Sequence, residues 1–113
     1  MTANTLANFV IGNLYQVKEF FWYLYPSWKQ AKNNDVAFAG SMNDAKINSK
    51  YLNVTFVGVN DIFVPLEFND DYCKIVTTDG KVGWIIIGIN LMDSDSDWYL
   101  NCFRELKKQN VNP

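Results

Sequence analysis

The sequence predicts a small, mainly β domain of about five antiparallel strands, with a long loop and a short C-terminal helix or strand. The chain has 113 residues, 49% of them apolar and 19% charged, which suits one domain with a single core. Apolar and polar residues alternate over Leu52–Phe56 and again over Ile62–Phe68, as in strands with one buried face. Asp79-Gly80 lies between two apolar runs and is a typical hairpin signal.

The first predicted strand is the aromatic-rich segment Leu14–Tyr25. Its leucines and valine also fit a helical spacing, but the aromatic residues favour a strand. Pro26-Ser27 ends this segment, and Trp28–Lys32 is expected to form one helical turn. Residues 1–13 precede it as an N-terminal extension.

A long loop excursion is predicted over residues 27–50. Within it, residues 33–50 are small, polar and without a sustained period. The pattern leaves open a short helix at Asn43–Lys46. Long loops in compact domains are often functional, so this segment is a candidate to carry part of a binding surface.

A meander of three strands follows, at Ile62–Phe68, Tyr72–Thr78 and Val82–Ile87. Pro65 has no N–H for a sheet hydrogen bond, which indicates an edge strand or a bulge. Gly83 beside a tryptophan indicates a bulge or a close approach of two backbones.

The turn at Asp79-Gly80 is expected to be of type I′, in which both central residues have positive φ. Near the end of the chain, Phe103–Leu106 fits either a short helix or a last strand. Residues 109–113 are expected to form a frayed tail.

The stretch from Asp61 to Ile87, DIFVPLEFNDDYCKIVTTDGKVGWIII, resembles the core of SH3-like barrels of the bacterial type. In those barrels a strand ending in Leu-Glu is followed by a Tyr-x-Lys-Ile/Val-x-Thr strand, an Asp-Gly-x-x-Gly-Trp hairpin and a short terminal strand. The resemblance implies a single SH3-like domain over residues 14–108. The proline-binding groove of eukaryotic SH3 domains is not implied, because their Pro-x-Asn-Tyr segment is replaced here by Ile86–Asn90.

Fourteen asparagines and nine lysines accompany a single arginine, Arg104, a bias typical of AT-rich genomes. With this bias and its small size, the chain resembles accessory proteins of large tailed phages of the T-even type. The resemblance implies a viral protein in the cytoplasm of a bacterial host. The sequence has neither a readable signal peptide nor an apolar run that could span a bilayer, which predicts a cytoplasmic protein without membrane contact.

The residue inventory argues against enzymatic chemistry, a cofactor or a metal site. The chain has no histidine to act as a base or ligand, and its two cysteines, Cys73 and Cys102, are expected to be reduced thiols. Asp93–Asp97 has the Asp-x-Asp-x-Asp opening of a calcium loop. However, Trp98 stands where that loop needs glycine and Arg104 where it needs glutamate, which predicts a solvated loop.

Aromatic residues are in excess, with four tryptophans, six tyrosines and eight phenylalanines. Our first choices for the core are Phe21, Phe56, Phe63 and Trp84. A small barrel cannot bury all of them, so the remainder should form an exposed patch that marks an interaction site. The residues predicted to contact a partner are Tyr25, Trp28, Trp98 and Tyr99, edged by Asp93 and Asp95.

The charge balance chooses between two functional hypotheses. We expect a non-enzymatic module that binds another protein, from the host or the virion, through a basic or apolar patch on that protein. The alternative is a nucleic-acid-associated barrel like the KOW and Tudor types, involved in transcription or nucleoid interaction. A net charge of −2 and a single arginine disfavour nucleic acid as the partner. The pattern leaves the oligomeric state open.

Overall fold

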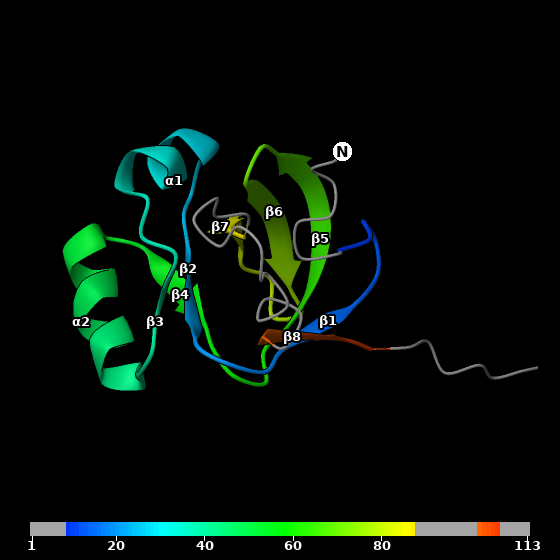
Figure 1. Ribbon diagram of the computed structural model, residues 1–113, viewed down its shortest axis with the longest axis horizontal. Helices are drawn as coiled ribbons and strands as arrows, with labels where there is room; N and C mark the ends of the chain where they lie inside the picture. Colours follow the sequence, from blue (N-terminus) through cyan, green and yellow to red (C-terminus); the bar gives the residue numbers. More distant parts are fainter. Residues whose placement is uncertain (1–8, 88–101, 107–113) are drawn as a thin grey trace, which may run out of the picture.

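The computed structural model describes residues 9–87 and 102–106, which form two antiparallel sheets and two helices (Figure 1). The larger sheet has five strands in the order β7-β6-β5-β1-β8, and the smaller has three in the order β3-β2-β4. In the larger sheet the strands are β1 (Tyr15–Val17), β5 (Ile62–Asn69), β6 (Tyr72–Thr77), β7 (Val82–Ile86) and β8 (Phe103–Glu105). The smaller sheet consists of β2 (Phe21–Leu24), β3 (Phe38–Ala39) and β4 (Thr55–Val57). The β-rich prediction is confirmed, but the described strands form no closed barrel.

The segment predicted as one first strand, Leu14–Tyr25, is divided between the two sheets. β1 pairs with β5 and β8, whereas β2 pairs with β3 and β4. The chain turns between them at Phe20, which has a φ of 72°. A positive φ at a bulky residue has no sequence signal, so the pattern predicted the strand conformation but missed the corner.

The predicted loop excursion over residues 27–50 is instead mostly regular structure. It contains α1 (Trp28–Asn34), the short strand β3 and most of α2 (Met42–Leu52). Serines at the two N-caps, Ser27 and Ser41, accept hydrogen bonds from backbone N–H groups of the first turns, at 3.1 Å each. The helical turn expected at Trp28–Lys32 is therefore confirmed, and the short helix left open at Asn43–Lys46 is the middle of a longer one.

The predicted meander is present as β5, β6 and β7. The β5–β6 pairing shifts register between Pro65 and Glu67, so the proline lies at a bulge. The turn after β6 differs from the predicted type I′. Gly80 has a φ of 96° but Asp79 does not have a positive φ, and the Gly80 N–H donates to the Thr77 carbonyl at 3.0 Å. This is a three-residue loop with glycine in the left-handed position, stabilised by the Thr77 hydroxyl, which donates to the Asp79 carboxylate and accepts from the Lys81 N–H.

The two sheets meet where β2 ends against β7. Tyr25 and Trp84 exchange two backbone hydrogen bonds, with N···O distances of 2.9 and 2.7 Å. The close approach expected at Gly83 occurs here: a Cβ atom at this position would lie 2.7 Å from both Leu24 Cγ and the Tyr25 carbonyl oxygen. Only glycine lets the backbones approach so closely.

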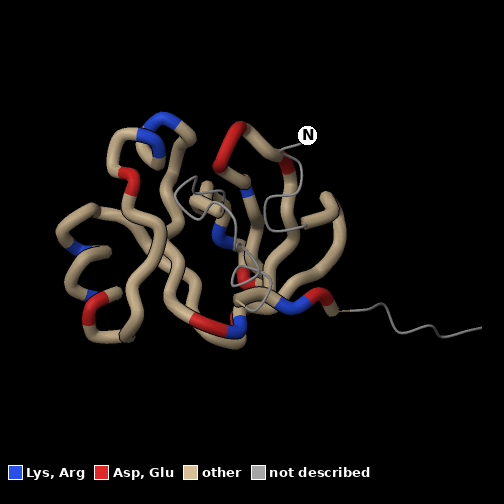
Figure 2. The backbone as a smooth tube through the Cα atoms, viewed as in Figure 1, with Lys and Arg blue, Asp and Glu red and all other residues tan. Residues whose placement is uncertain are grey.

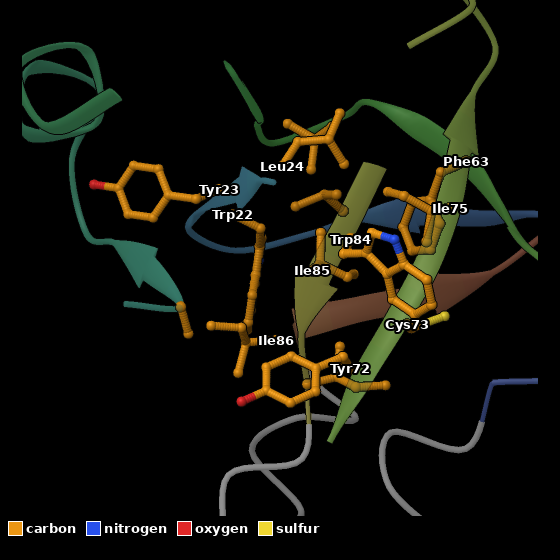
Figure 3. Packing of buried hydrophobic residues seen from close by; sticks show 14 of the residues in the cluster. Trp22, Tyr23, Leu24, Phe63, Tyr72, Cys73, Ile75, Trp84, Ile85 and Ile86 are labelled. Carbon is orange, nitrogen blue, oxygen red and sulfur yellow. The ribbon is translucent and has the colours of Figure 1, made fainter. Parts of the chain in front are cut away.

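The core lies between the sheets and continues under the helices. Trp22, Ile85 and Ile86 come from β2 and β7 and lie between these strands, while Tyr23 points to the opposite side, towards α2 (Figure 3). Of the predicted core aromatics, Phe63 and Trp84 are buried. Phe21 and Phe56 are only partly buried and pack against the core from its margin. Around Phe56 the predicted alternation has the wrong phase, because Leu52 ends α2 and Val57 is the buried residue of β4.

The C-terminal ambiguity is resolved as a strand, β8, which pairs with β1 through Phe103, Arg104 and Glu105. Beside it, Cys102 is buried, as is Cys73 in β6, and both are free cysteines, as expected.

Candidate functional site

The predicted contact surface is only partly within the described chain. Asp93, Asp95, Trp98 and Tyr99 lie outside the described residues, as does the whole Asp93–Asp97 loop. The structure therefore places two of the predicted contact residues, Tyr25 and Trp28.

Tyr25 is fully buried, so the prediction that its ring faces a partner is wrong in this structure. Its hydroxyl donates to the Val36 carbonyl oxygen at 2.7 Å, and its backbone pairs with Trp84. Burial raises the pKa of the phenol to about 12. The sequence placed Tyr25 at the end of a strand but could not indicate that a second sheet covers it there.

Trp28 is partly exposed and begins α1. Its ring meets the Tyr72 ring edge-on, with centroids 6.3 Å apart, so α1 packs over the start of β6. The Lys32 ammonium, one helical turn later, lies 5.0 Å from the centre of the indole. The indole Nε1 is buried and has no hydrogen-bond partner among the described residues. In Trp28, therefore, the ring contacts the Lys32 ammonium, and the indole N–H donates no hydrogen bond to the described residues.

Three aspartates gather around this aromatic pair, and we call Asp35, Asp70 and Asp71 the acidic corner. Asp35 is the C-cap of α1, with a φ of 55°. Asp70 and Asp71 form the turn between β5 and β6, and Asp70 has a φ of 56°. In Figure 2 this turn is drawn in red at the same end of the molecule as α1. Aspartate suits both places because its short side chain tolerates the left-handed conformation.

The negative charges of Asp35 and Asp70 disfavour ionisation of the neighbouring Asp71. Burial, and then the charges of Asp70 and Asp35, raise the pKa of Asp71. Burial together with all three carboxylates raises the pKa of the Tyr72 phenol. The carboxylates of a turn and of a helix cap, far apart in the sequence, are therefore close enough to raise the pKa of the same groups.

None of the three carboxylates forms an ion pair with a residue of the described chain. Asp35 also sits at the negative end of a helix, where its charge is unfavourable for the fold. Within residues 9–87 and 102–106, no three side chains of the Asp, Glu and Cys types have the arrangement of a metal site. Within the described chain, the acidic corner is therefore a group of carboxylates without ion pairs beside the partly exposed ring of Trp28.

The cysteines offer no reactive thiolate. Burial raises the pKa of both Cys73 and Cys102 to about 12, so each is a neutral thiol at physiological pH.

In the described part of the chain, no helix has the length and apolar character needed to cross a bilayer.

Sequence reasoning missed Asp35, Asp70, Asp71 and Tyr72 as members of a site. In the sequence, Asn33-Asn34-Asp35 fits a helix stop and Asn69-Asp70-Asp71 fits a tight turn, where aspartate is favoured for local reasons, and Tyr72 was predicted as the start of a strand. Each has a sufficient local reason to be there. Only the packing of α1 on β6 brings them together, and no sequence signal reports that contact.

Comparison with known proteins adds no relative: no family model matches the chain, and no curated protein or solved structure matches it either.

Proposed function

We propose that this protein is a non-enzymatic protein-binding module and that its contact surface is the acidic corner together with Trp28, whose ring packs on the buried ring of Tyr72. The partner is a segment of another protein that presents lysine or arginine side chains. The observation that carries this proposal is the unpaired charge of Asp35, Asp70 and Asp71 around the partly exposed ring of Trp28.

A basic segment would relieve two costs at this surface. It would neutralise carboxylates of the acidic corner, where burial and then the charges of Asp70 and Asp35 raise the pKa of Asp71. Its alkyl stems would cover the partly exposed ring of Trp28. The contact between Lys32 and Trp28 supports cation binding over the indole. Asp93, Asp95, Trp98 and Tyr99 remain predicted members of the same surface.

We also propose that the five-stranded sheet corresponds to an SH3-like core. The meander β5–β6–β7 covers the stretch that resembles these barrels, and the first and last strands, β1 and β8, pair with each other. On this proposal β2, β3, β4 and the two helices are the content of one long insertion. A phage-encoded accessory protein in a host cytoplasm remains the proposed biological setting.

The experiment compares two variants with the same net charge. The corner variant carries Asp35→Asn, Asp70→Asn and Asp71→Asn, and the control carries Glu19→Gln, Asp44→Asn and Glu67→Gln. The probe is a fluorescent capped octapeptide of alternating lysine and glycine, titrated by fluorescence anisotropy in 50 mM salt. We expect the corner variant to bind about tenfold more weakly than the wild type and the control to stay within about twofold.

Equal weakening in both variants would show that only net charge matters and would contradict the proposed surface. A second probe is a duplex DNA of random sequence, for which we expect a Kd above about 10 μM even in low salt. Sub-micromolar duplex binding that persists in 150 mM salt would replace the proposal with the nucleic-acid alternative.

A further inference from the structure

The outer edge of β7 is only partly paired. β7 is the edge strand of the five-stranded sheet, next to β6. On its other side, Tyr25, the residue that follows β2, pairs with its backbone through two hydrogen bonds with Trp84. The edge is therefore paired at Trp84 and its pairing goes no further among the described residues.

The next outward-facing backbone groups on this edge belong to Val82. N–H and C=O groups point to alternate sides along a strand, so the residue two before Trp84 faces the same way. Opposite Val76 of β6, Val82 occupies a position without hydrogen bonds to that strand. Within the described chain no backbone hydrogen bond is made by Val82, and its side chain is 52% exposed. One donor and one acceptor are thus open to an incoming strand.

A groove of about 330 Å³ lies beside this edge. Its walls come from the end of β2, the start of β4 and the start of β7, and consist of Leu24, Pro26, Asn53, Val54, Thr55 and Val82. None of these side chains is charged. The groove therefore suits an uncharged, predominantly apolar side chain.

The sheet surface next to the groove is also uncharged and apolar along one row of residues. Val82 lies opposite Val76, and Val76 lies opposite Val64, so three valines form a row across β7, β6 and β5. All three are at least partly exposed. An extended segment on the edge of β7 would therefore contact Val82, the residue that belongs to both this row and the groove.

We propose that the outer edge of β7 at Val82 is a strand-addition site for an extended, uncharged segment of a partner protein. The segment continues the pairing that Tyr25 begins, with its backbone bonded to Val82 and an apolar side chain in the groove. The free backbone groups specify an extended occupant, and the uncharged walls specify its side chains. This site is separate from the acidic corner and does not depend on it.

The test is an NMR titration of the ¹⁵N-labelled full chain with a capped hexapeptide of alternating threonine and valine. We expect amide shift changes centred on Val82 and Thr55, and slower hydrogen exchange at the Val82 amide. Val82→Pro removes the outward N–H and should weaken binding about fivefold, the value of one net hydrogen bond. Val82→Thr keeps that N–H and the branched side chain, so it should stay within about twofold of the wild type.

Two further measurements separate loss of the site from loss of the fold. Thr55 is exposed, so Thr55→Phe should fill the groove at a nearly unchanged Tm while leaving the edge N–H in place, and should weaken binding about tenfold. The same hexapeptide with alternate amides methylated cannot form the edge hydrogen bonds and should not bind. Equal binding of the methylated peptide, or shift changes centred elsewhere, would overturn the proposal. Protection of the Val82 amide that rises with protein concentration alone would assign the edge to a second copy and would also overturn it.

Discussion

The two sheets of this protein are held together in different ways. In the larger sheet, β5, β6 and β7 are consecutive strands joined by tight turns, and each pairs with its neighbour in sequence. In the smaller sheet, β2, β3 and β4 have four, two and three residues, and helices separate them in the chain. Hairpins bring strands together locally, whereas strands this short do not persist without packing around them.

The smaller sheet obtains that packing from both of its faces. On one face the indole of Trp22 is buried, and its Nε1 donates to the Glu19 carbonyl at 2.9 Å. On the other face the Tyr23 hydroxyl accepts from Asn48 Nδ2 of α2 at 3.1 Å. We therefore expect the larger sheet to be stabilised by its tight turns and strand register in addition to its buried side chains, and the smaller sheet to depend on side-chain packing and on its junction with β7.

The largest expected effect is at that junction. Gly83→Ala places a Cβ atom 2.7 Å from the Tyr25 carbonyl oxygen, a backbone atom that can move only if β2 moves. We expect a loss of about 3 kcal/mol in the free energy of unfolding, the upper range for overpacking, measured by urea denaturation. Hydrogen exchange should accelerate first at the Tyr23 amide of the smaller sheet, while the Thr77 amide of the larger one stays protected.

Gly40→Ala is the matched control, because no atom lies within 4 Å of the position its Cβ would take. It should change stability by less than about 0.5 kcal/mol. Equal acceleration of the Tyr23 and Thr77 amides in Gly83→Ala would show that the two sheets unfold as one unit, against the proposed difference.

The next effect tests the dependence of the larger sheet on its turns. Gly80 has a φ of 96°, a conformation that a β-branched side chain adopts only with strain. We expect Gly80→Val to cost about 1 to 2 kcal/mol, seen as a lower urea midpoint with the slope unchanged. Gly80→Asn, which tolerates the left-handed region better, should cost less. An unchanged midpoint in Gly80→Val would mean that this hairpin is not a determinant of the fold.

The smallest expected effect is a gain in folding stability when a charge of the acidic corner is removed. Burial and neighbouring carboxylates raise the pKa of Asp71 in the folded state, so the fold favours its protonated form. The resulting penalty is absent below the unfolded pKa and is complete once the pH exceeds the folded pKa. Because the side chain is only partly buried, we expect Asp71→Asn to stabilise by only a few tenths of a kcal/mol at pH 7, and not at pH 3.

Asp44→Asn serves as the counterpart to that prediction. Asp44 lies in the first turn of α2, where a negative charge is favourable. Its neutralisation should lower the Tm slightly at pH 7, opposite in sign to Asp71→Asn. If both variants shift the Tm in the same direction at pH 7, the corner carboxylates do not repel one another as the structure indicates.

Local sequence patterns explain the residue types of the candidate site but not their assembly into one surface. Asp35, Asp70 and Asp71 were readable as cap and turn residues, because local backbone geometry selects aspartate there. Trp28 was readable as a large aromatic residue at the start of a helical turn. These residues form one surface only because α1 packs across β6. Tyr25 is not part of that surface, because the end of β2 pairs with β7 and Tyr25 is buried there.

The sequence by itself determined the meander, and it marked Pro65 and Gly83 as special positions while leaving open a bulge or an edge at Pro65 and a bulge or a close approach at Gly83. In each case the controlling interaction is between residues near one another in the chain, or is a steric requirement of a single residue. Tertiary structure alone decided the corner at Phe20, the division of the first strand between two sheets and the conversion of a polar stretch into α2. These features gain their stability from burial against distant parts of the chain, and local propensity does not report burial.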